Sequence, residues 1–308
     1  MHDEELWTII IRTRGNKSSE LSQAVRSVVS QKYQSKSLIV AIHTKDPALV
    51  QETRTVLKTF QNKIPLSILL ADPSKKRGHP LNIALDHCQG RYVSFLDDDD
   101  KLLPGAGSFL ISKLQKDNLN FAYGKAEINH QPDTKEKIET YSHSFNPIRL
   151  VAENYIPIGS FIYDFSEFAD IRTDETIDMW EDWYLLLSML FSGKMRARFF
   201  DHSVLEIRTN GQRASNTLNE LNLSKIRTDY NVIEKAFIRK TFPISYEDSF
   251  LIYPKLAVLQ EKPNTSEIQL LRSALLYHKE ITDRYAVRLY LKLVHLLKRA
   301  PPEPLFPQ

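Results

Sequence analysis

The chain's 308 residues suffice for one sizeable core and at most about two domains, and 42% hydrophobic with 26% charged residues excludes a disordered or fibrous protein. Lys and Arg (41) barely exceed Asp and Glu (38), so bulk charge gives no reason to expect a nucleic-acid partner. The single cysteine, Cys88, excludes an intramolecular disulfide framework and favours a reducing compartment.

Strand and helix patterns alternate over the first hundred or so residues. Apolar, β-branched runs predict strands at 7–12, 37–43, 66–71 and 92–96, and helical spacing of apolar residues predicts helices at 18–32, 47–60 and 80–87. This alternation predicts parallel strands joined by right-handed crossovers, hence an open α/β sheet with helices on both faces. Ligands of such sheets bind at the carboxyl ends of the strands.

Further elements extend this sheet. We expect a helix from about 104 to 115, strands at 121–126, 160–163 and 195–200, and a helix at 181–191. The polar stretch 129–144 is typical of a mobile loop that covers a ligand. Together these elements predict a catalytic domain over 1–215.

The remainder, 216–308, predicts a helical region broken by Pro243. Its last helix, 283–299, is basic and amphipathic, a pattern that serves packing against a domain or partner subunit more often than binding to anionic lipid. Acidic residues at 3–5 precede any apolar run, unlike a secretory signal, and no apolar stretch reaches the ~18 residues of a membrane span. We expect a cytoplasmic catalytic part, with peripheral contact at the inner face of the membrane as an alternative.

Four consecutive carboxylates, Asp97, Asp98, Asp99 and Asp100, directly follow the apolar strand RYVSFL. They repel one another unless water solvates them or a cation lies between them. Mg²⁺ or Mn²⁺ is often held by one or two carboxylates and by substrate phosphates, so a metal here implies a phosphorylated substrate. The alternative is a solvated turn in which Asp100 caps the next helix. The position at the carboxyl end of a strand favours the metal.

The segments TIIIRTRGNKSSELSQAVRSVVSQKY and RGHPLNIALDHCQGRYVSFLDDDDKLLPG carry a resemblance to a known family. Over residues 6–215 the chain resembles the family 2 glycosyltransferases, which implies the GT-A fold, a Rossmann-like and mostly parallel sheet flanked by helices. The second segment is similar to the one that ends in the family's DxD motif. The resemblance implies that Asp99 binds the metal, and that Asp97 and Asp98 contact the nucleoside or a metal-bound water.

The resemblance also implies a nucleoside diphosphate sugar as donor, of the UDP or GDP type. Residues that follow the strands would bind its nucleotide, namely Thr13, Arg14 and His43, while Arg77 would face the diphosphate. The chain departs from the family at Arg12-Thr13-Arg14, where proline, threonine and an aromatic residue are usual. His43 stands near the usual acidic uridine contact, and Asn210 stands where a histidine ligand is expected. His202 lies nearby in sequence, but such a lone histidine is more often structural.

The run DETIDMWEDWYLLLSMLFSG places Glu181 and Asp182 between Trp180 and Trp183 at the start of an apolar helix. A partly desolvated carboxylate is ionised yet basic enough to accept a hydroxyl proton. The chemistry alone favours the other account, in which the helix dipole stabilises two acids in the first turn. The run resembles the family's ED motif, which implies that Asp182 is the general base and Glu181 its support, or the reverse. The two tryptophans would then face the acceptor.

The resemblance implies an inverting transfer of one sugar to a hydroxyl of a saccharide or glycolipid acceptor, in polysaccharide or glycolipid assembly. Arg208 and Arg213 are candidates for contact with the diphosphate or acceptor, and a solvated basic loop explains them equally well. Two other functions stay open, a catalytically silent module that binds nucleotide sugars and a sugar nucleotidyltransferase. The second needs a glycine-rich, arginine-containing loop after the first strand, and Arg14-Gly15-Asn16-Lys17 is sparse for that purpose.

Overall fold

The computed structural model describes residues 5–129, 139–152 and 154–208, together with 228–229, 232–233 and 236–237. The chain divides into two compact units, Met1–Gly211 and Gln212–Gln308. The helix expected at 283–299 and the candidates Asn210 and Arg213 lie outside the described residues.

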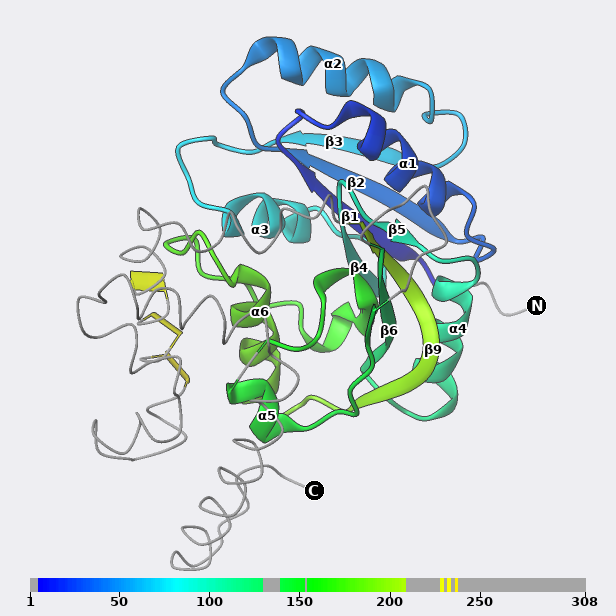
Figure 1. Ribbon diagram of the computed structural model, residues 1–308, viewed down its shortest axis with the longest axis vertical. Helices are drawn as coiled ribbons and strands as arrows, with labels where there is room; N and C mark the ends of the chain where they lie inside the picture. Colours follow the sequence, from blue (N-terminus) through cyan, green and yellow to red (C-terminus); the bar gives the residue numbers. More distant parts are fainter. Residues whose placement is uncertain are drawn as a thin grey trace, which may run out of the picture. The chain divides into compact units, whose positions relative to one another are not determined.

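The first four strands form a parallel half-sheet in the spatial order β3-β2-β1-β4 (Figure 1). Each element of this half was predicted from the sequence, with bounds that differ by a few residues. α2 begins at a well-defined cap, because the Asp46 carboxylate accepts a hydrogen bond from the Ala48 amide (2.8 Å) and Pro47 occupies the first helical position. The bounds are β1 Trp7–Thr13, α1 Ser18–Val29, β2 Lys36–Ile42, α2 Pro47–Lys58, β3 Leu66–Leu70, α3 Gly78–Asp86 and β4 Tyr92–Asp97.

The second half of the sheet is mixed in direction, in the order β4-β8-β6-β9-β5. β8 is antiparallel to β4 and β6, β6 and β9 are parallel, and β5 and β7 add antiparallel pairs. The sheet is therefore parallel throughout β1–β4 and mixed beyond it, where β6 and β9 pair in parallel and the other pairs are antiparallel. Strand β7 lies within the expected loop. The bounds are β5 Lys101–Leu102, α4 Ala106–Lys116, β6 Phe121–Asn129, β7 Glu139–Tyr141, α5 Pro147–Ala152, β8 Phe161–Asp164, α6 Glu181–Phe191 and β9 Ala197–Arg208.

Alternate side chains of β1 enter different layers of the fold. Trp7, Ile9 and Ile11 pack in a cluster with apolar residues of α1, α2 and α4 on one face of the sheet. Ile10 is equally buried but lies outside that cluster, on the side of the sheet where α3 packs (Figure 1). Burial of each such isoleucine contributes about 2 kcal/mol. Both faces of the central strands are thus covered, as the continuous apolar run of β1 predicts.

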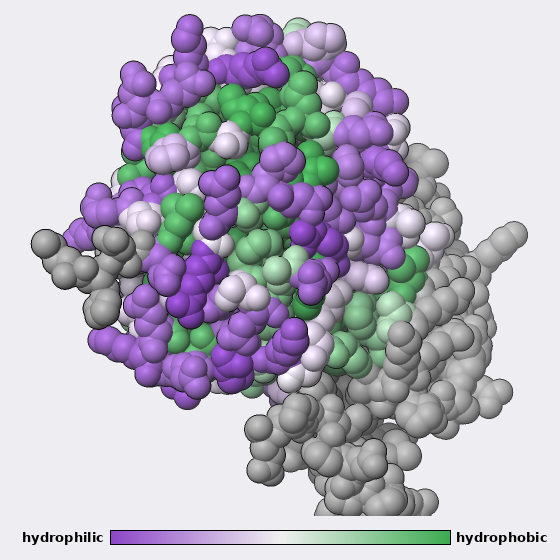
Figure 2. Space-filling view, turned by 180° about the vertical axis from the view of Figure 1, so that it is seen from behind, coloured by the Kyte–Doolittle hydropathy of each residue, from purple (hydrophilic) through white to green (hydrophobic). Residues whose placement is uncertain are grey.

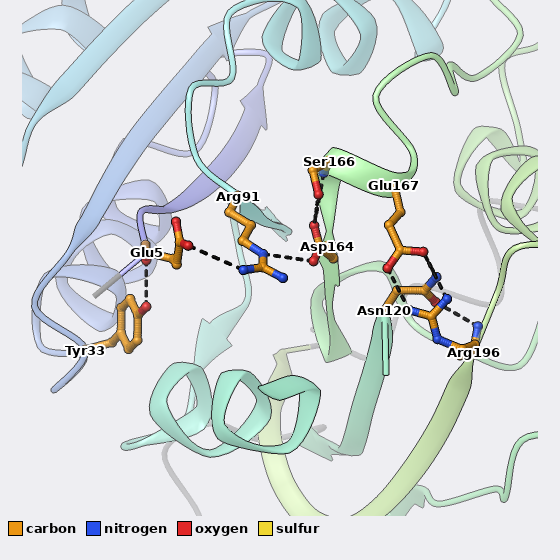
Figure 3. A network of polar contacts seen from close by, with 8 residues as sticks. All are labelled: Glu5, Tyr33, Arg91, Asn120, Asp164, Ser166, Glu167 and Arg196. Atoms are coloured by element: carbon orange, nitrogen blue, oxygen red, sulfur yellow. Dashed lines mark hydrogen bonds and ion pairs between the residues drawn. The ribbon is translucent and has the colours of Figure 1, made fainter. Parts of the chain in front are cut away.

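A chain of ion pairs fixes the edge of the sheet at which the parallel strands begin (Figure 3). Arg91, just before β4, contacts Glu5 (3.3 Å) and Asp164 at the end of antiparallel β8 (3.0 Å). Beside it, Arg196 pairs with Glu167, and Asn120 donates to the same carboxylate (2.7 Å). These contacts fix the edge at which β1 and β4 begin. Because β1–β4 are parallel, their carboxyl ends lie together at the opposite edge.

The outer strand β3 leaves part of its apolar surface accessible, and Leu70 is 56% exposed. Apolar residues also gather on the upper part of the face shown in Figure 2, surrounded by polar ones. Within the part of the chain that the structure describes, no helix combines the length and the hydropathy that a membrane crossing requires.

Candidate functional site

The carboxyl ends of β1 and β4 bring the first two groups of candidate residues together. The two strands are adjacent and parallel, with Arg12 in register with Asp97. Thr13 ends β1, Asp97 ends β4 and the other three aspartates follow it. The end of β9 reaches the same place, because the Arg208 amide donates to Asp100 (3.1 Å). The sheet topology therefore assembles residues that are up to 196 positions apart in the sequence, from Arg12 to Arg208.

Each of the four aspartates has a partner of its own. Arg12 Nε lies 3.3 Å from Asp97 Oδ1, and Lys17 Nζ lies 2.5 Å from Asp99 Oδ2. The Thr13 hydroxyl donates to Asp98 (2.5 Å), and Asp100 accepts the Arg208 amide. The protein itself thus offsets much of the repulsion within the cluster, through two cations that the sequence did not identify as partners, Arg12 and Lys17.

The inner aspartates have structural surroundings. Asp100 is buried and does not cap α4, whose N-cap residue is Gly105, so the capping alternative is wrong. Burial raises the pKa of Asp98 to about 6, against the Thr13 hydrogen bond that lowers it. Asp100, buried against the Arg208 amide, therefore offers little surface to a ligand, whereas Asp98 is half-buried.

Asp97 and Asp99 remain accessible, with 27% and 22% of their side-chain surface exposed. Among the described residues no group of three or more His, Cys, Asp and Glu side chains forms a closed metal site. Two accessible carboxylates on one turn nevertheless fit the open coordination of Mg²⁺ or Mn²⁺, whose remaining ligands are phosphates and water. The donor set is therefore compatible with the expected metal.

The nucleotide-binding candidates lie along the ends of β1 and β2. Arg14 is exposed, and the His43 amide donates to the Thr13 carbonyl oxygen (2.8 Å), so the two strand ends are fastened together. His43 Nε2 lies 3.1 Å from the Asp72 carbonyl oxygen, which selects the tautomer with the proton on Nε2. Burial lowers the pKa of His43, so its ring is neutral at pH 7.

The two acids of the ED pair occupy different environments. Glu181 is 2% exposed and accepts a hydrogen bond from Arg12 Nη1, with Arg77 Nε at 3.5 Å. Burial disfavours its charge, but the two guanidinium groups outweigh burial and lower the pKa of Glu181. Burial disfavours the charge of Arg12, but the carboxylates of Glu181 and Asp97 outweigh burial and raise its pKa. Glu181 is therefore a fixed, neutralised anion.

Asp182 has weaker support for its charge. It is half-buried, and burial together with the charge of Glu181 raises its pKa to about 6. Its Oδ1 accepts the Trp183 amide (2.8 Å), and its Oδ2 accepts Asn154 Nδ2 (3.0 Å). A carboxylate with these properties is ionised at neutral pH yet basic enough to accept a proton.

Helix α3 fixes the segment that leads into α6. Asn82 exchanges two hydrogen bonds with the backbone of Thr173 (2.9 and 3.0 Å), and the Thr173 hydroxyl donates to the Glu181 carbonyl oxygen (2.6 Å). Lys76 pairs with Asp178 (2.7 Å). These contacts join the loop that carries Arg77 to the start of α6.

The two tryptophans of the ED run have different roles. Trp183 is buried, and its indole donates to the Leu150 carbonyl oxygen of α5 (2.7 Å), so it is a packing anchor and the expected contact with a ligand needs correction. Trp180 is half-buried and adopts a left-handed backbone conformation (φ 63°) directly before the two acids. Such conformations in bulky residues concentrate at functional sites. Of the two tryptophans, Trp180 is therefore the one with a surface that a ligand can contact.

Arg208 and His202, the remaining described candidates, both contact neighbouring side chains. Arg208 lies at the edge of the site, where its guanidinium donates to Gln23 (2.9 Å). His202 stacks on Phe109 with ring centroids 4.0 Å apart, in agreement with the expected structural role. Sequence reasoning missed Asn154 and the pairing role of Arg12. For Arg12 a signal was available, since it is the one charged residue in the mostly apolar run of β1.

Comparison with known proteins gives one family match and several partial relatives. The model for Glycosyl transferase family 2 matches residues 8–168. An Escherichia coli protein, UDP-Glc:alpha-D-GlcNAc-diphosphoundecaprenol beta-1,3-glucosyltransferase WfgD, is 29% identical over 126 residues, which cover 41% of this chain and 47% of that protein. A Campylobacter jejuni GalNAc(5)-diNAcBac-PP-undecaprenol beta-1,3-glucosyltransferase is 31% identical over 110 residues, 35% of this chain and 33% of that one. The match thus spans less than half the length of either curated relative.

Solved structures with the same fold include S. aureus TarS 1-349. Its complex with UDP-GlcNAc has a TM-score of 0.57 at 15% identity, covering 80% of this chain and 75% of that chain. Its complex with UDP has a TM-score of 0.55 at 17% identity, covering 85% and 76%. The expected GT-A architecture is thereby confirmed.

Proposed function

Because this chain belongs to glycosyl transferase family 2, we propose that it transfers a sugar from a nucleoside diphosphate sugar to a hydroxyl acceptor by a single inverting displacement. The observation that carries the proposal is the bridge made by Arg12. This one guanidinium, on a side chain that is 12% exposed, contacts Asp97 on the carboxylate turn and Glu181 at the start of α6. The proposed donor side and the proposed base therefore belong to one site.

In the reaction, the acceptor oxygen attacks the anomeric carbon from the face opposite the diphosphate. A new carbon–oxygen bond forms, the bond to the diphosphate oxygen breaks, and the acceptor proton moves to Asp182. The pKa of about 6 suits Asp182 for this step at neutral pH, whereas Glu181 is occupied by Arg12 and Arg77. We therefore assign Asp182 as the general base. Glu181 instead positions the guanidinium groups of Arg12 and Arg77.

We further propose that Asp97 and Asp99 hold Mn²⁺ or Mg²⁺ together with the donor diphosphate. When bound, the ion offsets the negative charge that grows on the leaving diphosphate. Arg77 supports the same charge, since 43% of its side chain is exposed beside Glu181. Lys17 is an exposed cation on Asp99 and must share or release that carboxylate when an ion binds.

The substrates are proposed from the relatives. Both curated relatives are named for transfer to saccharides on undecaprenol diphosphate carriers, one of them from UDP-Glc, and the TarS structures hold UDP-GlcNAc or UDP. We propose a UDP sugar as donor and a lipid-linked saccharide as acceptor, in polysaccharide or glycolipid assembly, with a GDP sugar as the alternative donor. His43, neutral at the end of β2, is the proposed base contact with Thr13 and Arg14 beside it. Such an acceptor requires a cytoplasmic protein to meet the membrane peripherally.

The test is a transfer assay with the full chain. UDP-glucose, UDP-N-acetylglucosamine and a GDP sugar are each offered with Mn²⁺ and N-acetylglucosaminyl-diphosphoundecaprenol, and the anomeric configuration of any product is read by proton NMR. We expect one donor to give a product of inverted configuration. Asn120→Ala, at the opposite edge of the sheet, is the matched control and keeps turnover. Nucleotide binding without transfer from any donor supports a silent binding module, and retention of configuration contradicts the proposed displacement.

A further inference from the structure

One polar side chain at the proposed base has no place in the function described so far. Asn154 follows α5, and its Nδ2 donates to Asp182 Oδ2 at 3.0 Å. Its own carbonyl oxygen is buried and has no hydrogen-bond partner among the residues that the structure describes. A buried acceptor without a donor lowers the stability of the folded protein. The hydrogen bonds of Asn154 itself therefore do not explain its position.

Two other asparagines of the same unit show the usual arrangement. Asn120 donates to Glu167 and to the Lys194 carbonyl oxygen, and its Oδ1 accepts the Arg196 amide (2.7 Å). Asn82 donates to Thr173 and Glu175, and its Oδ1 accepts the Thr173 amide. Both ends of these amides are used, as expected of structural residues. Asn154 uses only the end that faces Asp182.

The orientation of the Asn154 amide follows from its neighbour. With the amide turned over, its oxygen would face the oxygen of an ionised carboxylate, and the hydrogen bond would become a repulsion. The backbone nearby is well fixed, because Trp183 of α6 donates to Leu150 of α5 and the next residues, Tyr155 and Ile156, are buried. Asn154 is thus held against Asp182 from outside α6.

We propose that Asn154 is a positioning residue for Asp182, fixing its carboxylate for proton transfer and favouring its ionised form. The inference rests on the proposed function. With Asn154 on Oδ2 and the Trp183 amide on Oδ1, each carboxylate oxygen keeps one of its lone-pair positions for the acceptor hydroxyl. A base oriented by a third group is a recurring arrangement in enzymes.

Several groups around Asp182 raise or lower its pKa, and Asn154 is one of those that lower it. Burial and Glu181 favour the protonated form of Asp182, Arg12 opposes them, and Arg77 lowers the pKa of the neighbouring Glu181. The Trp183 amide and Asn154 are the hydrogen-bond donors that favour the ionised form. Loss of Asn154 therefore raises the pKa of Asp182 further, and a carboxylate in its place raises it more.

The first test is the pH dependence of kcat in the wild type, Asn154→Ala, Asn154→Asp and the control Asn120→Ala. We expect Asn154→Ala to lower kcat about tenfold and to move the acidic limb upward by about one pH unit. Asn154→Asp moves that limb further, and the KM for the donor stays within about twofold. Asn120→Ala lowers stability but leaves the limb in place. A limb unchanged in both Asn154 variants overturns the inference while the proposed function stands.

A second test does not depend on turnover. The free energy of unfolding is measured against pH for Asn154→Ala, Asp182→Asn and the double variant. If the amide supports the ionised carboxylate, the deficit of Asn154→Ala grows as the pH rises through about 6 and is smaller in the Asp182→Asn background. A deficit that is independent of pH and additive with Asp182→Asn refutes the contact, whether or not any donor is turned over.

Discussion

The most specific consequence of the site concerns the cost of keeping Asp182 ionised. Asp182→Asn replaces the carboxylate with a neutral side chain of the same shape. In the folded protein the pKa of this carboxyl rises from 3.8 to about 6, so the ionised form is less stable there than in the unfolded chain. Two pH units correspond to about 3 kcal/mol, and the loss of a favourable acid from the first turn of α6 offsets up to ~1 kcal/mol of it.

We therefore expect Asp182→Asn to stabilise the protein by about 2 kcal/mol at pH 8. The folded state binds this proton more tightly than the unfolded chain, so the wild type loses stability as the pH rises from about 4 to about 6. The variant lacks that loss. At pH 4 the carboxyl is protonated in the folded state and about half ionised in the unfolded chain, so most of the difference is absent and the two proteins should be close in stability.

The assay is urea unfolding followed by tryptophan fluorescence at pH 4 and pH 8. All three tryptophans (Trp7, Trp180 and Trp183) belong to the first unit, so the signal reports on that unit alone. Glu20→Gln is the control, because it removes a first-turn acid from α1, and it should lose a few tenths of a kcal/mol instead of gaining. Asp182→Asn should keep nucleotide binding and lose transfer by about 10²-fold or more. The reasoning is refuted if Asp182→Asn is less stable than the wild type at pH 8, or if the difference in their free energies of unfolding is the same at both pH values.

Three further variants test other parts of the structure. Arg12→Met removes the nearest cation from the buried Glu181 and should lower the free energy of unfolding by about 3 kcal/mol, measured with urea; a loss below ~1 kcal/mol would contradict the bridge. Gly107→Ala places a methyl group against the Trp7 ring and should cost about 2 kcal/mol in thermal unfolding, with UDP binding unchanged. Lys17→Met removes the cation that competes for Asp99 and should tighten Mn²⁺ binding about threefold by titration, whereas weaker binding would show that Lys17 recruits the diphosphate instead.

The sequence predicted the parallel half of the fold because each element there carries its own signal. The runs at Trp7–Thr13 and Tyr92–Asp97 are apolar on both faces, and the helices between them have regular spacing. The second half depends on pairings between distant strands, such as β6 with β9, which no local pattern specifies. The two-residue strand β5 is too short to leave any signal at all.

The candidate site divides in the same way. The four aspartates and the two acids of α6 were predicted as site residues because they adjoin apolar elements, the first group at the end of β4 and the second at the start of α6. Their partners were not, since Arg12 and Lys17 pair with residues more than 80 positions away. Asn154 is a lone polar residue after a short helix, and nothing in the sequence distinguishes it from a solvated one. Trp183 looked like a ligand contact because burial cannot be read from a helix that is apolar on most sides.

The proposal that Asp97 and Asp99 grip a divalent cation together with a donor diphosphate is tested most directly by electron paramagnetic resonance of Mn²⁺. Free Mn²⁺ is measured with UDP alone, then with UDP and the wild type, Asp97→Asn/Asp99→Asn or the control Asn120→Ala. We predict that the wild type and Asn120→Ala lower the free Mn²⁺ signal well below that with UDP alone, and that the double variant does not. An equal decrease with the double variant, or no decrease with the wild type, contradicts a metal site at this turn.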